Sequence, residues 1–394
     1  MASSQLGLAA SKTVPARQAS EFELLCACCR GASSEPGLSQ VLASPLNWDR
    51  VLALAEHHRL LPALYCAIRD RYEVPGSIHS VIRARYNAKA RSALRFSAEL
   101  ARVLRHFEDR GIRALAHKGP ALAEKLYGDP AMRQFGDLDL LVRARDVADA
   151  RAALTELGYE AGIRLSPRQE KEFLCLGYEY SFGLNSEPHL LELQWQIVPR
   201  FYSIDFDMES LFLRSTELRF EGFSLRSLGD EDLMLVLCVH AAKHEWSQLG
   251  MLRDIVTMAR FDLDWEWIAA EGRRLGIIRI MLISLTLAHQ MLGSELPEQL
   301  TLCPEMSSAG ALSSAFQLGL SNGVQNETES VRYFGAAMKV RERWQDRVRL
   351  AWRLAVNPSI REWQAVRLPD SLFQLYRAVR ILRLAKRLVV NSAS

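Results

Sequence analysis

Apolar residues recur along this chain with two different spacings. Between residues 21 and 110, and again after residue 228, they recur about every three or four positions, as expected for amphipathic helices. Between residues 111 and 227 the apolar runs are shorter and are separated by glycines or prolines, which predicts strands alternating with short helices. The pattern therefore predicts an α+β protein, in which N-terminal and C-terminal helical regions flank a core with a small mixed sheet.

These changes of spacing also divide the chain into parts. The first residues are rich in Ser and Ala and have no acid before Glu21, which predicts a disordered arm. Serines and glycines predict that the segment from about 303 to 330 is partly irregular. The expected parts are a disordered arm at 1–20, an N-terminal helical region at 21–110, a mixed core at 111–227, a helical region at 228–300 and a basic C-terminal helical region at 301–394.

The mixed core contains four runs with the pattern of strands. They lie at 112–116, 137–142, about 178–184 and about 189–198, with a turn at 185–188 between the last two. A helix is expected at 120–127, because Pro120 follows Lys118-Gly119 and proline is favoured in the first turn of a helix.

One of these strands contains two aspartates, Asp137 and Asp139, in the run Gly136-Asp137-Leu138-Asp139-Leu140. Since side chains alternate between the faces of a strand, both carboxylates lie on one face, about 7 Å apart at their base. Carboxylates this close raise each other's pKa, and a divalent cation removes that repulsion. A strand edge with two solvated aspartates would explain an isolated pair, but the preceding glycine and the apolar strand end favour a metal site.

A third carboxylate occurs on a later strand, in Leu191-Glu192-Leu193-Gln194-Trp195. The apolar residues of this run share one face, which leaves Glu192 and Gln194 on the other. A charge within such an alternation faces solvent or a metal site. Glu192 is therefore the candidate for a third metal ligand.

The composition of the chain argues against only a few classes of function. The net charge of +3 over 394 residues gives no overall electrostatic signature of a nucleic-acid binder. The seven cysteines have no spacing typical of a zinc site, and we expect them to be reduced thiols, which favours a cytoplasmic protein. No run of about 18 apolar residues is present, so no transmembrane segment is expected.

Several motifs in order resemble a bacterial family of uncharacterised nucleotidyltransferases, a branch of the polymerase beta-like nucleotidyltransferase superfamily. The resemblance spans about residues 45 to 290. The motifs that support it are Ala55-Glu56-His57-His58, Lys118-Gly119-Pro120, Leu126-Tyr127-Gly128-Asp129-Pro130, Gly136-Asp137-x-Asp139, Leu191-Glu192-Leu193-x-Trp195 and His240-Ala241-Ala242-Lys243-His244.

The resemblance implies a polymerase beta-like catalytic core at 111–227, closed on one side by the helical region at 228–300. It implies an NTP substrate, with ATP expected, and a two-metal mechanism with Mg²⁺ or Mn²⁺. Asp137, Asp139 and Glu192 would be the catalytic metal ligands. Lys118-Gly119 stands where the superfamily usually has Gly-Ser, so the backbone at Gly119 and the charge of Lys118 would bind phosphate oxygens.

Other candidate residues have alternative interpretations. Arg133 would lie near the triphosphate or on the surface, and Lys243 and His244 would line the nucleotide site. His240 and His244, four apart on a helix, would share a face. They would line the cleft or be core or surface histidines, and zinc binding by this pair is the least favoured hypothesis. The arginine-rich tail fits either solvated amphipathic helices or, as the less favoured alternatives, contact with RNA or a membrane surface.

Three functions remain open. The favoured one transfers an NMP from an NTP to a hydroxyl or phosphate of a small molecule, peptide or protein. The same chemistry on RNA, such as a tRNA end, is the first alternative, and a catalytically silent nucleotide-binding module is the second. The three carboxylates argue against a silent module, and the low net charge argues against RNA.

Overall fold

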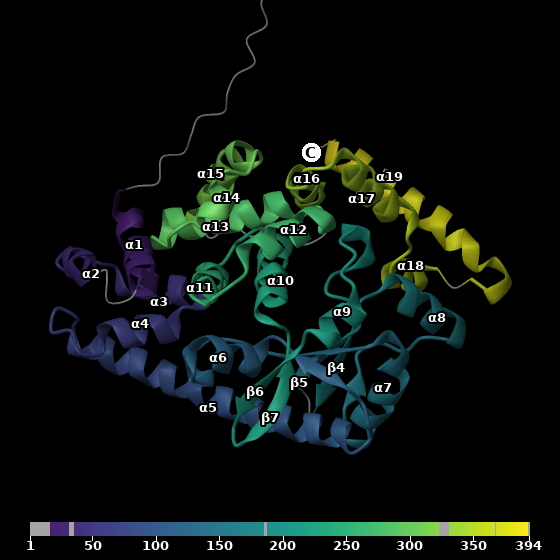
Figure 1. Cartoon of the computed structure of the whole chain (residues 1–394), viewed down its shortest axis with the longest axis horizontal. Coiled ribbons are helices and arrows are strands. Elements are labelled where there is room, and N and C mark those ends of the chain that lie inside the picture. The colour runs from purple at the N-terminus through teal and green to yellow at the C-terminus, as the bar shows by residue number, and fades with distance from the viewer. Residues whose placement is uncertain (1–15, 31–34, 185–186, 323–330, 367, 393–394) are drawn as a thin grey trace, which may run out of the picture.

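A computed structural model describes residues 16–30, 35–184, 187–322, 331–366 and 368–392. It contains a five-stranded mixed sheet, a two-stranded hairpin and helices on both sides of them, which confirms the α+β class (Figure 1). The predicted arm at 1–20 lies mostly outside the described residues, and helix α1 (Ala16–Arg30) includes its last positions.

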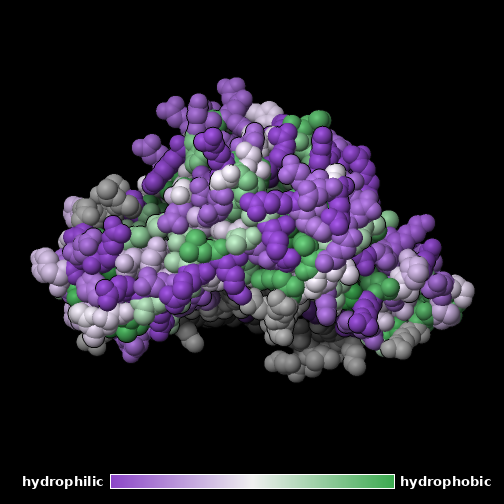
Figure 2. Space-filling model, turned by 90° about the horizontal axis from the view of Figure 1, so that it is seen from below, coloured by the Kyte–Doolittle hydropathy of each residue, from purple (hydrophilic) through white to green (hydrophobic). Residues whose placement is uncertain are grey.

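The N-terminal helices follow the predicted pattern. Asn47 caps α3 by accepting a hydrogen bond from the backbone N–H of Arg50, and Pro62 lies in the first turn of α4. Helix α5 is long and runs along one side of the molecule, and this side is largely hydrophilic with scattered hydrophobic residues (Figures 1 and 2). The helices after α1 are α2 (Glu35–Leu42), α3 (Trp48–His57), α4 (Leu61–Ile68) and α5 (Gly76–Glu108).

The main sheet has the strand order β1-β2-β5-β4-β3. β2 and β5 are parallel, whereas the other neighbouring pairs are antiparallel, so the sheet is mixed as expected. Its strands are β1 (Ala114–Ala116), β2 (Leu138–Val142), β3 (Glu160–Ala161), β4 (Glu179–Leu184) and β5 (Glu187–Gln194). The helices between them are α6 (Gly119–Tyr127), α7 (Val147–Glu156), α8 (Pro167–Leu176) and short 3-10 turns at Pro130–Met132 and Ala144–Asp146.

The two faces of this sheet differ in polarity. Alternate residues of the central strands pack with α5 and α7 into one apolar core; from the sheet it includes Leu138, Leu140, Tyr180, Phe182, Leu191 and Leu193. The residues between them lie on the opposite face because side chains alternate along a strand. On that face the strand registers place Asp139 beside Glu192, Glu192 beside Ser181, and Gln194 beside Glu179.

A second, larger core consists mainly of helices. Helix α13 is buried along most of its length and packs against α10, α11 and α15. The helical spacing predicted after residue 228 is confirmed, since α10 to α14 follow one another from residue 230 to residue 301. The elements of this part are a 3-10 turn at Arg200–Tyr202, α9 (Met208–Leu213), the hairpin β6 (Thr216–Phe220) and β7 (Phe223–Ser227), α10 (Asp230–Lys243), α11 (Leu249–Met258), α12 (Trp265–Leu275), α13 (Ile278–Leu292) and α14 (Glu298–Thr301).

The C-terminal region is helical. Of the segment from about 303 to 330, predicted to be partly irregular, residues 303–305 lie in a turn and residues 306–322 form a helix, α15, whereas residues 323–330 lie outside the described residues. Helix α15 packs on α13, and the hydroxyl of Ser313 donates to the carbonyl of Gly310. Serine and glycine thus lie within a helix because tertiary packing outweighs their low helix propensity. The elements are α15 (Met306–Asn322), α16 (Val331–Lys339), α17 (Trp344–Val356), α18 (Ile360–Ala365), a 3-10 turn at Asp370–Leu375 and α19 (Tyr376–Ser392).

Several arginines of this basic tail bind groups of the protein itself. Arg341 is buried and pairs with Asp346, and both Arg380 and Arg383 pair with the buried Glu362. Within the described ranges, none of the helices combines the length and hydrophobicity that a bilayer crossing requires. All seven cysteines are free thiols.

Candidate active site

Two of the predicted carboxylates lie side by side on the polar face of the sheet. Asp139 of β2 and Glu192 of β5 are direct partners in the register of these parallel strands. Gln194, one position further along the same face of β5, donates from Nε2 to Asp139 Oδ1 at 3.1 Å and to Glu192 Oε2 at 3.0 Å. Asp137 directly precedes β2 and is half-buried, whereas Asp139 is buried. The structure therefore brings the three predicted residues together on the polar face of the sheet, on and just before the neighbouring strands β2 and β5.

Lys118 lies opposite this acidic group. It follows β1, and its Nζ is 2.9 Å from Asp139 Oδ1, with both side chains largely buried. Burial alone would lower the pKa of Lys118 and raise that of Asp139. The attraction between the two outweighs burial, so the pKa of the lysine lies above its ordinary value and that of the aspartate lies below.

The other two predicted carboxylates have raised pKa values, so their charged forms are less favourable. Burial, followed by the charges of Glu179 and Asp139, raises the pKa of Glu192 to about 8. Burial and the charge of Asp139 also raise the pKa of Asp137. The site thus holds more carboxylates than Lys118 can neutralise, and a further cation would stabilise their charged forms.

Gly119 places the start of α6 against the strand that follows it. Its φ of +57° is strained for other residues, and a Cβ at this position would lie 3.0 Å from the backbone carbonyl oxygen of Asp137. Helix α6 begins at this glycine, with Pro120 in its first turn as predicted. The N-terminus of a helix therefore approaches the acidic group, an arrangement suited to binding an anion such as phosphate.

Arg133 is neither on the surface nor without a partner. Its Nε is 2.9 Å from Asp254 Oδ2 on α11, and the hydroxyl of Tyr127 donates to the other oxygen of that carboxylate at 2.8 Å. The charge of Asp139 also acts on Arg133. Arg133 is therefore not a free surface side chain, and its proximity to a bound triphosphate stays a prediction.

Arg59 is a second cation in this neighbourhood, which the sequence analysis did not identify. The charges of Asp137, Asp139 and Arg133 all act on its guanidinium. It has a positive φ of 57°, directly after His58, whose carbonyl accepts a hydrogen bond from the N–H of Gly250 at 3.0 Å. Its position one residue beyond the Ala55-Glu56-His57-His58 motif was the available signal.

A family model described as an uncharacterised nucleotidyltransferase matches residues 44–293. The chain belongs to this family. Comparisons with curated proteins and with solved structures give no match. The matched range includes the carboxylates, Lys118, Arg59 and Arg133, and it ends just after α13.

Lys243 is the last residue of α10 and His244 caps that helix. Lys243 Nζ donates to the hydroxyl of Tyr178 at 2.9 Å, and that hydroxyl donates to Glu179. Burial lowers the pKa of Lys243, and burial together with the Lys243 charge lowers that of His244 to about 3. His244 is therefore a neutral group, with its ring 4.7 Å from that of His240.

Whether a divalent cation fits here depends on the donor atoms of the acidic group. Among the residues that the structure describes, Gln194 Oε1 is buried without a hydrogen-bond partner, beside the carboxylates that its amide nitrogen contacts. Carboxylate and amide oxygens are the donors that Mg²⁺ prefers. No group of three or more His, Cys, Asp or Glu side chains among the described residues is arranged as a ready metal site. The oxygen donors thus fit a divalent ion, although in this structure Lys118 forms an ion pair with Asp139.

Proposed function

We propose that this chain transfers a nucleoside monophosphate from an NTP, with ATP as the expected nucleotide, to a hydroxyl or phosphate of an acceptor. A small molecule, peptide or protein is the expected acceptor. The observation that supports this most is the in-register pair of Asp139 and Glu192 on parallel strands, with Asp137 beside them and Lys118 opposite. Membership of a nucleotidyltransferase family supports the reaction class.

Asp137, Asp139 and Glu192 would hold the divalent cation, which we propose to be Mg²⁺ or Mn²⁺. When bound, such a cation neutralises charge on phosphoryl oxygens and supplies several kcal/mol of transition-state stabilisation. A carboxylate on β2 and one on its parallel neighbour β5, on a small mixed sheet, also support the polymerase beta-like fold that we propose for residues 111–227.

The remaining charged groups would bind the triphosphate. Lys118 and Arg59 are cations close to the carboxylates, and the first turn of α6 presents backbone N–H groups behind Gly119. Arg133 would act at longer range, since Asp254 already holds its guanidinium. Together they would fix the α-phosphorus near the carboxylates and orient the leaving pyrophosphate.

The test is transfer of label. Wild-type protein is incubated with each α-labelled NTP, Mg²⁺ or Mn²⁺, and extract of the native host, and the labelled fraction is identified. We expect label in small molecules, peptides or protein, and none with Asp139→Asn. Label confined to RNA would show that the acceptor is RNA and would contradict the acceptor class proposed here. Equal labelling by Asp139→Asn would contradict the assignment of the site.

Nucleotide binding provides an independent measurement. With Mg²⁺ and a non-hydrolysable ATP analogue, the melting temperature of wild type should rise, because ligands that bind only the folded state stabilise it. Asp139→Asn should gain little under the same conditions. An equal gain in both proteins would show that Asp139 does not hold the metal–nucleotide complex.

A further inference from the structure

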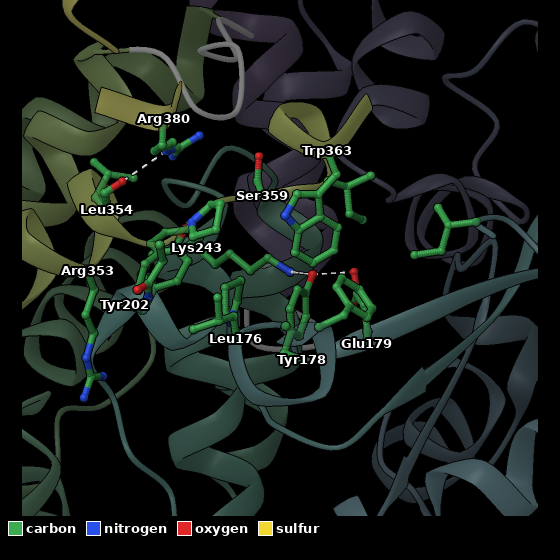
Figure 3. A pocket seen from close by; sticks show the side chains of 18 of the residues that line it. Leu176, Tyr178, Glu179, Tyr202, Lys243, Arg353, Leu354, Ser359, Trp363 and Arg380 are labelled. Atoms are coloured by element: carbon green, nitrogen blue, oxygen red, sulfur yellow. Dashed lines mark hydrogen bonds between the residues drawn. The ribbon is translucent and has the colours of Figure 1, made fainter. Parts of the chain in front are cut away.

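A cavity of about 380 Å³ lies beside β4, on the face of the sheet that holds the carboxylate group. Figure 3 shows side chains that line it. Glu179 and Ser181 of β4 line it, and both lie on the face that holds Asp139 and Glu192. Ser181 is the direct register partner of Glu192. The cavity is therefore separated from the proposed metal ligands by one strand spacing, about 4.8 Å.

The walls of this cavity are mainly apolar and aromatic. At one end Lys243 reaches across to Tyr178, which in turn contacts Glu179, and Trp363 lies above them (Figure 3). Further apolar surface comes from the side chains of Phe173, Leu176, Phe201, Phe334, Leu354 and Ile360. A concave site of this size, with an aromatic lining and a few convergent polar groups, is typical of small-molecule binding.

Two buried polar atoms in the cavity wall have no hydrogen-bond partner within the part of the chain that the structure describes. They are the hydroxyl of Tyr202 and the indole N–H of Trp363, on side chains that are only 8% and 5% exposed. A buried donor without a partner costs about 1–3 kcal/mol, so such groups usually have a ligand or water to bind. Both atoms belong to residues that line the cavity, and a ligand with hydrogen-bond acceptors would satisfy them.

We propose that this cavity binds the acceptor, and that the acceptor is a small hydroxyl-bearing molecule with a flat, largely apolar body, such as an aromatic alcohol. This rests on the proposed function. The apolar body would lie against Phe173 and Trp363, and the hydroxyl would point past Ser181 toward Glu192. A nucleic-acid strand would need an open groove with free cationic walls. Here the cationic side chains that line the cavity, Lys243, Arg353 and Arg380, already contact Tyr178, Asp205 and Glu362, respectively.

Transfer to this hydroxyl forms one P–O bond and breaks another. Its oxygen forms a bond to the α-phosphorus of the NTP while the bond from that phosphorus to the oxygen bridging to the β-phosphate breaks. Pyrophosphate leaves with the electron pair, and the hydroxyl proton passes to water. The product is a phosphodiester between the nucleoside and the alcohol.

Much of the cavity comes from outside the range that the family model matches. Trp363 of α18, Leu354 of α17 and Phe334 of α16 all follow residue 293, the end of that range. The nucleotide-binding residues lie within it. The C-terminal helices would therefore determine acceptor specificity, while the matched part would supply the transfer chemistry.

The test measures binding of defined aromatic alcohols without turnover. Dissociation constants of 2-naphthol, 4-ethylphenol and 2-phenylethanol are determined by ligand-observed NMR for wild type, Trp363→Phe and Tyr202→Phe. Tyr202→Phe keeps the ring and removes the hydroxyl, whereas Trp363→Phe removes the indole N–H and leaves a smaller aromatic ring. The matched control is Trp352→Phe, since Trp352 lies on α17 and is 67% exposed. Melting of every variant shows whether it is folded.

We expect saturable binding of at least one alcohol to wild type, weakened about three- to tenfold in Trp363→Phe or Tyr202→Phe and unchanged in Trp352→Phe. No saturable binding of any member, or equal affinity in all four proteins, would overturn the proposal. Stabilisation by Mg²⁺ and the ATP analogue is measured on the same samples. Nucleotide binding without alcohol binding contradicts only the acceptor site, and the reverse result contradicts only the proposed function.

Discussion

Gly119 offers a sharp test, because two separate costs of adding a methyl group there can be distinguished. In Gly119→Ala the φ of +57° alone would cost about 1–2 kcal/mol of folding free energy. The new Cβ would also lie 3.0 Å from the carbonyl oxygen of Asp137, so that residue must shift by a few tenths of an ångström. Metal ligation tolerates about 0.2 Å in its distances, and misplacing reacting groups by about 1 Å costs roughly a hundredfold in rate.

Gly128 at the other end of α6 is the matched control. Its φ is +68°, and a Cβ there would meet nothing within 4 Å. Gly128→Ala should therefore lose about 1–2 kcal/mol of folding free energy, as Gly119→Ala does from its φ alone, and should keep its transfer rate. Gly119→Ala should lose at least about tenfold in nucleotide affinity or rate in addition. Denaturant unfolding and labelled-NTP transfer below both melting temperatures measure the two effects. Equal activity of the two variants would refute the contact between Gly119 and Asp137 as a determinant of the site.

Four other substitutions test the charged and buried groups of this region. Asp139→Asn should abolish transfer and lower the metal-free melting temperature, since it leaves the buried Lys118 without its counter-charge, whereas Asp137→Asn should abolish transfer without that loss because burial already raises the pKa of Asp137. Lys118→Ala should weaken binding of the ATP analogue, and unchanged affinity in calorimetry would rule out its phosphate role. Burial and the neighbouring His57 lower the pKa of His58 to about 3, so its contribution to stability is present above about pH 6.5 and is lost as pH falls toward 3. His58→Asn should make the melting temperature less sensitive to acid between about pH 6 and pH 4, and an identical slope would contradict the neutral buried state.

The polar face of the sheet was predictable because it depends on a local rule. Alternation along 138–142 and 187–194 decides which side chains share a face, and it places Asp139, Glu192 and Gln194 together once the two strands are neighbours. The alternation of apolar and polar residues does not predict that β2 and β5 are parallel neighbours. The resemblance to the nucleotidyltransferase family supplied the expectation that these two runs meet.

Contacts between distant segments were not predictable from the pattern. Arg133 and Asp254 form an ion pair across 121 residues of chain, and no periodicity links a loop before β2 with the middle of α11. Arg59 has a positive φ that non-glycine residues rarely adopt, so its sequence gives no local sign of that conformation. The serines and glycines at 307–314 lie within α15, because packing on α13 favours a helix where local propensity suggests irregular structure.

The pairing of Lys118 with Asp139 gives a physical reason for the departure from Gly-Ser in this chain. Glu192 and Asp137 have raised pKa values because the polar face buries several carboxylates together, and a serine hydroxyl there would leave Asp139 without a neutralising charge. A lysine stabilises the buried aspartate when no divalent ion is bound. If a cation takes over that role, the ammonium is released beside the start of α6, where a triphosphate would bind. One side chain would then stabilise the fold without metal and bind phosphate with it, so the two roles of Lys118 would alternate and would not compete.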